Sequence, residues 1–177
     1  MKRRAIVLSL ILAVDALAPG APARGQSAVT AGQGVQVSPA DRAAIEQLLA
    51  AYNQALSTCA SMQYADLFTA DGTFTSDDFR GAKHRQLYGK RATLVGRDKL
   101  VELVETEEFC RNPQERAARA GTRAGGGASF SKLRLEPAVD GVHGSLPLGN
   151  GGRYEDVYVK TADGWKFRSR NVVMPAN

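Results

Sequence analysis

The stretch GGRYEDVYVKTADGWKFRSR, residues 151–170, decides the fold class. Its two halves alternate between polar and apolar or aromatic side chains, which is the two-residue period of a β-strand. The tripeptide Ala-Asp-Gly at 162–164 separates the halves and is typical of a tight turn. The chain is therefore predicted to end in an antiparallel hairpin.

The alternation also predicts which side chains share a face of this hairpin. On the first strand, one face carries Tyr154, Asp156 and Tyr158, and the other carries Val157 and Val159. On the second strand, Trp165, Phe167, Ser169 and Asn171 share a face, opposite Lys166, Arg168 and Arg170. An aspartate between two tyrosines makes the first strand a candidate wall of a site.

Helices are predicted upstream of this hairpin. Ser38 is a typical N-cap, Pro39 suits the first helical position, and Asp41 follows three residues after the cap. Apolar residues then recur at helical spacing and predict a helix over residues 39–57. Shorter helices are predicted over residues 60–68 and 96–109.

The remaining segments are predicted as strands and loops. Short strands are expected at 72–76 and 92–95, with a polar loop over 77–90 between them. Alternating apolar residues predict another strand near 133–139, after a basic and then glycine-rich segment over 111–127 that would make a poor core. Helices followed by a terminal antiparallel sheet predict the α+β class.

The amino-terminal segment has the order of a cleavable secretory signal: basic residues at 2–4, an apolar run, and Ala-Pro-Ala at 21–23. We expect cleavage after Ala23, with Gln26 and Ala28 as later alternatives, and a protein that is periplasmic or secreted. The apolar run is too short for a stable membrane anchor. A flexible leader is then expected over residues 24–37, followed by one domain over residues 38–177.

Charge and motifs exclude several classes of function. The formal net charge of the chain is +5, and the signal contributes three of its positive charges. The basic segment with Arg111, Arg116, Arg119 and Arg123 is a solvated loop or a site for an anionic ligand, but it lacks interleaved aromatic residues, which disfavours nucleic-acid binding. No spacing of residues matches a metal site or a phosphate-binding loop, so no cofactor is expected.

Four segments resemble the SnoaL-like branch of the nuclear-transport-factor-two-like superfamily: AIEQLLAAYNQAL (44–56), YADLFTADGTF (64–74), GRDKLVELVE (96–105) and the hairpin at 151–170. The resemblance implies a curved sheet wrapped around about three helices as a cone, with a pocket between the first helix and the concave face of the sheet. Members include polyketide cyclases, ketosteroid isomerases, dehydratases, epoxide hydrolases and plain binders. The resemblance alone therefore does not choose an activity.

Two residues match the oxyanion-binding pair of ketosteroid isomerases. Tyr52 resembles the tyrosine that donates to the substrate oxygen in those enzymes, and Asp156 resembles their protonated aspartate. The alternatives are a core tyrosine with its hydroxyl satisfied at the edge, and an aspartate paired with Arg153 or Arg168. The general base of the isomerases matches Ser76, which cannot abstract a carbon-bound proton without an activating partner.

Asp77 is the candidate base that remains. It would face the pocket only if a β-bulge re-aimed its side chain, because strict alternation places it opposite Ser76. Asp78 follows one residue later. Histidine serves as the base in the dehydratase branch, and the chain has only His84, in the predicted loop, and His143, in a predicted turn. Both are otherwise exposed loop histidines.

Aromatic residues are expected to complete the ligand site. The pocket is predicted to be lined by Phe68, Phe74, Tyr154, Tyr158 and His84. Cys59 and Cys110 are the only cysteines, and an oxidising compartment would allow them to pair, although two separate buried thiols are the alternative.

The predicted function is binding of a small apolar or carbonyl-bearing molecule, with catalysis of the cofactor-free lyase or isomerase kind. The alternative is a non-catalytic ligand-binding or protein-interaction module. The resemblance also implies a homodimer through the outer face of the sheet, to which Val157, Val159 and Val172 would contribute.

Overall fold

The computed structural model of the chain describes residues 37–112, 114–115, 117, 130–149 and 151–175. The predicted signal peptide, nearly all of the predicted leader and most of the glycine-rich segment lie outside these residues. Within the described part, no helix is long and apolar enough to cross a membrane.

The first helix, α1, spans Pro39–Thr58 and agrees with its prediction. The Ser38 hydroxyl accepts a hydrogen bond from the Asp41 backbone N–H at 3.1 Å, and Pro39 occupies the first position, so both local signals for the helix start are realised. Ile45, Leu49 and Tyr52 lie on its buried face. This helix carries the first candidate residue of the site.

The other helices differ from their predictions. They are α2 (Ser61–Asp66), α3 (Ala82–Tyr88), α4 (Arg97–Glu105) and α5 (Glu108–Arg111). The predicted loop over 77–90 was wrong in that it contains α3, and the single helix predicted over 96–109 is divided in two. The division falls at Thr106, where the hydroxyl and the backbone N–H both donate to the Glu102 carbonyl, at 2.6 and 3.0 Å.

Among the described residues, six strands form one mixed sheet in the order β2-β1-β6-β5-β4-β3. They are β1 (Phe68–Ser76), β2 (Ala92–Val95), β3 (Arg134–Ala138), β4 (Gly141–Pro147), β5 (Arg153–Thr161) and β6 (Gly164–Val173). Only the β1–β6 pair is parallel. The predicted hairpin is confirmed as β5 and β6, and β4 corrects the turn predicted around His143.

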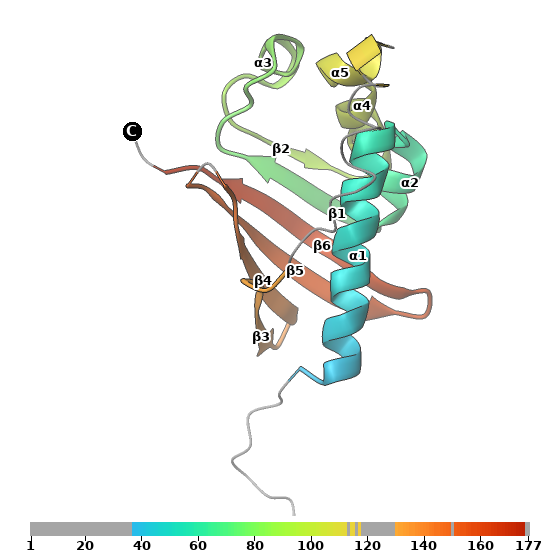
Figure 1. Ribbon diagram of the computed structural model, residues 1–177, viewed down its shortest axis with the longest axis vertical. Coiled ribbons are helices and arrows are strands. Elements are labelled where there is room, and N and C mark those ends of the chain that lie inside the picture. The colour runs from blue at the N-terminus through green and yellow to red at the C-terminus, as the bar shows by residue number, and fades with distance from the viewer. Residues whose placement is uncertain (1–36, 113, 116, 118–129, 150, 176–177) are drawn as a thin grey trace, which may run out of the picture. The chain divides into compact units, whose positions relative to one another are not determined.

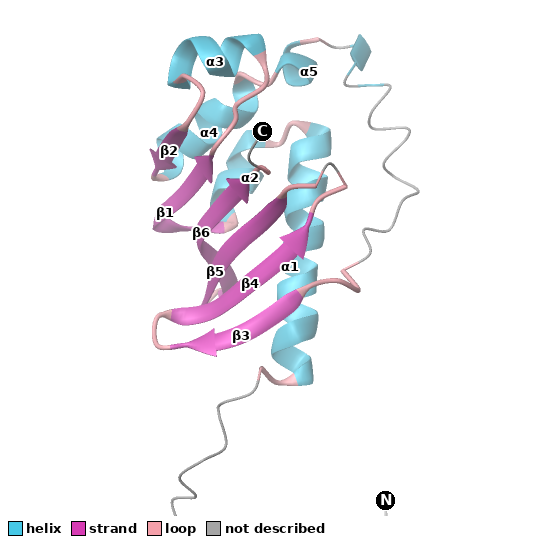
Figure 2. Cartoon of the chain, turned by 90° about the vertical axis from the view of Figure 1, so that its left-hand side faces the viewer, coloured by secondary structure: helices cyan, strands magenta, loops and turns pink. Residues whose placement is uncertain are grey.

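Helix α1 runs across one face of this curved sheet, and no described helix covers the opposite face of β3, β4 and β5 (Figures 1 and 2). The ring of Tyr52 on α1 lies 5.7 Å from that of Phe167 on β6, centroid to centroid. Both residues are buried. The predicted α+β class, with helices against a curved mixed sheet, is confirmed.

A β-bulge in β6 overturns the predicted faces of the second hairpin strand. On β5, Tyr158 pairs with Phe167 and Val157 pairs with Ser169, so Arg168 has no partner residue on β5 in the register. The extra residue reverses the alternation after Phe167. Arg170 therefore lies on the same inner face as Phe167, where it is 1 % exposed, instead of on the face opposite.

Candidate functional site

A cavity of about 410 Å³ lies between α1, α3 and the inner face of β1, β5 and β6. Its apolar wall includes Leu56, Phe74, Phe79, Leu103 and Val172. Val172 therefore lies on the inner face, and its predicted place on the outer face was wrong, because the bulge in β6 reverses the alternation. Its polar groups include Tyr52, Tyr154, His84, Glu107 and Arg80. A concave, largely apolar space with a few convergent polar groups is the usual form of a small-molecule site.

Tyr52 and Tyr154 form the aromatic side of the cavity. Their rings come from α1 and β5, and their centroids are 6.1 Å apart in an edge-to-face arrangement. Burial raises the pKa of the Tyr52 phenol well above its ordinary range, and the neighbouring phenols of Tyr154 and Tyr64 raise it further. Tyr52 is therefore a neutral hydrogen-bond donor at pH 7, as an oxygen-binding role requires.

Arg170 lies directly beneath these two rings. The carbon at the centre of its guanidinium is 4.0 Å from the Tyr52 ring centroid and 3.7 Å from that of Tyr154. Burial alone would lower the pKa of Arg170, but the neighbouring Asp156 carboxylate and the phenols of Tyr52, Tyr154 and Tyr158 together more than offset this, so the guanidinium is charged. A buried cation thus supports the aromatic side of the cavity.

Asp156 is the counter-ion of Arg170. Its Oδ2 lies 3.4 Å from Nη2 of Arg170 and accepts a hydrogen bond from the Tyr158 hydroxyl at 2.7 Å. Burial raises the pKa of Asp156, although Arg170 and Tyr158 partly offset the increase. The structure places Asp156 behind Arg170 and outside the lining of the cavity.

The arginine beside Asp156 is neither of the two considered from the sequence. Arg153 pairs with Glu155, and Arg168 donates to the Asp140 carbonyl. The bulge in β6 brings Arg170 opposite Asp156 instead. An alternation pattern alone gives no signal for it.

His84 and Glu107 form the opposite side of the cavity. His84 is 4 % exposed on α3, so it is not the exposed loop histidine considered above. Its Nε2 lies 2.9 Å from the Leu103 carbonyl, which can only accept, and so Nε2 carries a proton. Nδ1, which holds the lone pair whenever the ring is neutral, lies 3.6 Å from Oε1 of Glu107.

The three residues at the end of β1 point in different directions. Ser76 is buried and lines the cavity, whereas Asp77 pairs with Arg91 at 2.9 Å outside it. Regular alternation explains this difference, because Ser76 and Asp77 are neighbours in an extended segment. Asp78 reaches the edge of the cavity, and Arg85 donates to its Oδ1 at 2.8 Å.

The structure thus brings four of the predicted site residues to one cavity: Tyr52, Phe74, Tyr154 and His84. Four others do not line it, namely Phe68, Tyr158, Asp156 and Asp77. Phe68 and Tyr158 are buried against Phe167. Sequence reasoning missed Glu107 and Arg170, because Glu107 falls inside a predicted helix and Arg170 on a predicted outer face.

A disulfide joins Cys59, at the end of α1, to Cys110 in α5, with Cα atoms 5.5 Å apart. Glu107 lies immediately before α5. The disulfide therefore ties the helix that carries Tyr52 to the segment that carries Glu107. It links two sides of the cavity.

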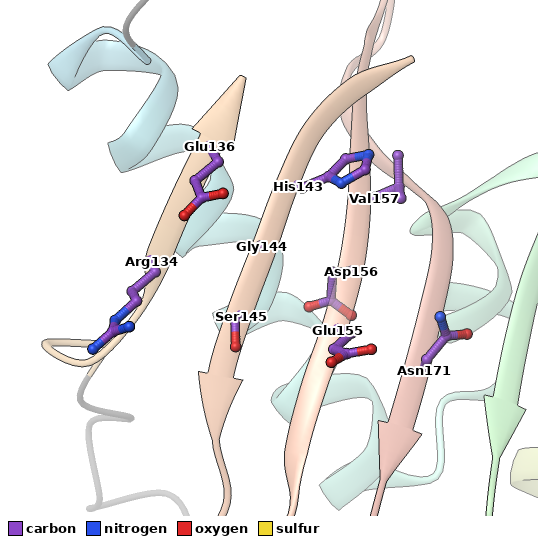
Figure 3. A pocket seen from close by; sticks show the side chains of 9 residues that line it. All are labelled: Arg134, Glu136, His143, Gly144, Ser145, Glu155, Asp156, Val157 and Asn171. Atoms are coloured by element: carbon purple, nitrogen blue, oxygen red, sulfur yellow. The ribbon is translucent and has the colours of Figure 1, made fainter. Parts of the chain in front are cut away.

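A second hollow of about 390 Å³ lies on the opposite face of the sheet. Figure 3 shows its side chains, among them Arg134, His143 and Glu155 from three adjacent strands. His143 is exposed and pairs with Asp140 at 2.8 Å. The described residues contain no group of three metal-binding side chains, here or elsewhere.

The curved mixed sheet, with helices on one face and a cavity between them, defines the class of nuclear-transport-factor-two-like cone folds. A model of the SnoaL-like domain family matches residues 38–171. The chain therefore belongs to the SnoaL-like domain family. No curated protein is significantly similar to it in sequence.

Solved structures of similar fold come from several bacteria. A protein from Catenulispora acidiphila in complex with S-DNPA has 22 % sequence identity and a TM-score of 0.50, over 76 % of this chain and 93 % of that one. An NTF2-like protein with a cystatin-like fold from Novosphingobium aromaticivorans has 16 % identity and a TM-score of 0.49, over 78 % and 84 %. ActVI-ORFA from Streptomyces coelicolor has 18 % identity and a TM-score of 0.48, over 75 % and 95 %.

Proposed function

We propose that this protein binds a small, partly apolar molecule that carries a carbonyl or phenol oxygen. The observation that carries this proposal is the cavity of about 410 Å³, in which the buried phenol of Tyr52 and the half-buried phenol of Tyr154 face a space with apolar walls. The apolar walls would provide affinity, and the Tyr52 hydroxyl would orient the ligand oxygen. The complex of the Catenulispora acidiphila protein with S-DNPA is consistent with ligand binding by this fold.

Export belongs to the same proposal. We infer that the protein acts in the periplasm or outside the cell, because residues 1–23 have the order of a secretory signal. The disulfide between Cys59 and Cys110 is consistent with an oxidising compartment. The ligand would then be a molecule met outside the cytoplasm.

A cavity-filling substitution tests ligand binding. Leu56 lines the cavity from α1, so Leu56→Trp should fill the space that a ligand needs. Asn53→Trp adds the same side chain on the exposed face of the same helix and is the matched control. The measurement is calorimetric titration with a panel of one- and two-ring phenols and ketones.

Binding by the native protein and the control, but not by Leu56→Trp, is the expected result. If none of these compounds binds the native protein, or if Leu56→Trp binds them equally well, the proposal is wrong. Protein folding is checked by the thermal midpoint, which the two tryptophan variants should share within a few degrees.

A second candidate function is a cofactor-free lyase or isomerase, and the His84–Glu107 pair favours it. The Nδ1 lone pair of His84 would accept a proton from a carbon next to the ligand carbonyl, and Glu107 would stabilise the imidazolium so formed. The electron pair of the broken C–H bond would move to the carbonyl oxygen, which accepts from Tyr52. Returning the proton to another carbon gives isomerisation, and giving it to a departing β-hydroxyl gives water and an alkene.

Exchange of carbon-bound hydrogen tests this chemistry without a known substrate. In D2O, the native protein should accelerate exchange of the α-protons of 2-tetralone, followed by NMR. His84→Gln should reduce this acceleration about 100-fold or more, the usual worth of a general base. His143→Gln, an exposed histidine outside the cavity, should leave it unchanged.

Tyr52→Phe tests the hydrogen bond that Tyr52 would donate to the ligand oxygen. It should weaken binding of a phenol by about 1–3 kcal/mol, the cost of losing one buried hydrogen bond, and it should leave the fold intact because the ring remains. Ligand binding without any acceleration of exchange by the native protein would support the alternative, a non-catalytic binding module.

A further inference from the structure

The ion pair of Arg170 and Asp156 is oriented with respect to the cavity. The guanidinium of Arg170 packs on the rings of Tyr52 and Tyr154, which line the cavity. Asp156 contacts Nη2 of the guanidinium and accepts from Tyr158, and neither Asp156 nor Tyr158 lines the cavity. The positive member of the pair is therefore the one nearer to the ligand space.

The surroundings of this pair keep it fixed. Arg170 and Asp156 are 1 % and 3 % exposed, so water does not screen their field. Among the described residues, Nε and Nη1 of Arg170 have no hydrogen-bond partner, so no further acceptor there offsets the positive charge of the guanidinium. The groups that face the guanidinium are Tyr52 from α1, Tyr154, Asp156 and Tyr158 from β5, and Phe167 within β6.

A cation on the face of a phenol ring strengthens the O–H as a hydrogen-bond donor and favours negative charge near it. Because the guanidinium is already in place and desolvated, this stabilisation requires no rearrangement when charge develops on a ligand oxygen. Stacking on two phenols at once applies the same effect to both donors on the aromatic side of the cavity.

We infer that Arg170 is a specificity-determining residue that acts through Tyr52 and Tyr154. It selects ligands whose bound oxygen carries or develops negative charge, which are ionisable phenols and ketones that form enolates. This inference rests on the proposed function, which places the ligand oxygen beside these phenols. Beyond that function, Arg170 makes the cavity bind an ionised ligand more tightly than a neutral ligand of the same shape.

The probe is 4-nitrophenol, whose absorbance reports its own ionisation. Bound to the native protein, it should ionise at a pH about one unit below the free compound, a tenfold preference for the anion that corresponds to a typical cation–π contribution. 4-Nitroanisole has nearly the same shape and cannot ionise, so its affinity measures how well the cavity binds a neutral ligand of that shape.

Two variants locate the origin of the shift. The double variant Arg170→Gln with Asp156→Asn removes both buried charges together and avoids a single uncompensated one. It should bind 4-nitroanisole within about twofold of the native protein but lose the ionisation shift. Arg170→Lys keeps the charge and should retain part of the shift. The other charged or titratable groups of the cavity are the same in all three proteins, namely Tyr64, Asp78, Arg80, His84 and Glu107.

The outcomes are distinct. A shift that survives unchanged in the double variant would show that Arg170 is not its source, and a native protein that binds 4-nitrophenol without any shift, or with a shift to higher pH, would overturn the inference without any variant. If the double variant loses 4-nitroanisole as well, Arg170 has a structural role only. If the native protein binds neither compound, the proposed function itself fails.

Discussion

Gly144 shows how one residue allows the buried network to form. It lies on the inner face of β4 opposite Asp156, and a Cβ atom built at this position would be 2.4 Å from Cε2 of Tyr158. Tyr158 cannot move aside easily, because it is fully buried and its hydroxyl donates to Asp156. The hydrogen bond from Tyr158 to Asp156 therefore requires glycine at position 144. This residue lies on β4, two strands away from Arg170 on β6.

Gly144→Ala should destabilise the protein by about 1–3 kcal/mol, the usual cost of overpacking a buried site. The free energy of unfolding in urea measures this. Gly149→Ala is the matched control, because a Cβ atom there would meet nothing within 4 Å, and it should change stability by less than about 0.5 kcal/mol. Equal stabilities of the two variants would contradict the packing argument.

At the scale of elements, Asp41 connects the first turn of α1 to the β5–β6 hairpin. Its Oδ1 accepts from Lys160 on β5 at 2.8 Å and from the indole of Trp165 on β6 at 3.2 Å. The hydrogen bond from Lys160 is the main cause that lowers the pKa of Asp41. The contribution of this carboxylate to stability is therefore present above the unfolded-state pKa near 3.9 and is lost as the pH falls through the lower folded-state pKa.

Asp41→Asn should lower the thermal midpoint at pH 7 and should have little effect at an acidic pH below the lowered folded-state pKa, where the native carboxyl is protonated too. Asp163→Asn, in the exposed hairpin turn, changes the same charge and should have little effect at either pH. The difference in midpoint between native protein and variant is measured across this range. A difference that stays constant with pH would mean that the carboxylate charge is not what stabilises the contact.

The elements differ in how well sequence predicts them, and the reason is physical. The start of α1 and the turn at 162–164 depend on local signals, a cap and a turn residue, and both are where the sequence places them. The bulge at Arg168 depends on packing between strands, so no local pattern marks it. Its consequence, a buried Arg170 beneath the cavity, could not be predicted from alternation.

The candidate site, like the fold, could be predicted only where local patterns determine it. The placement of Tyr52 and Tyr154 at the cavity could be predicted, because the helical and strand periods determine which face each residue occupies. The pairing of His84 with Glu107 joins α3 to the start of α5, two elements whose bounds the sequence did not give. A contact between residues of two such elements depends on tertiary packing, which local sequence patterns do not show.

For the molecule as a whole, export stays a prediction that one measurement checks. Protein recovered from the periplasm or the medium of cells that produce the full chain should begin near Arg24, with Gln26 and Ala28 as later cleavage positions. Sequencing of the amino terminus, or the intact mass, gives the answer. A product that retains Met1 would remove the basis for the export proposal.

The disulfide is expected to stabilise the fold and to hold one side of the cavity in place. Cys59 and Cys110 are separated by 51 residues in sequence. Closing a loop of this length in the unfolded chain stabilises the folded protein by about 4 kcal/mol in the chain-entropy model. Removing the disulfide should also free the start of α5, where Glu107 faces His84, so ligand binding should weaken together with stability.

Cys59→Ser with Cys110→Ser, or the native protein under a strong reductant, should therefore unfold at a lower urea concentration by an amount equivalent to about 4 kcal/mol. The double variant removes the bond without leaving a reactive thiol, and reductant should not change its stability further, which controls for effects of the reductant itself. The thiols of the native protein are titrated after unfolding without reduction. Two free thiols, or equal stability with and without the bond, would show that the folded protein does not depend on this disulfide, and Glu107 would then be held against His84 by packing alone.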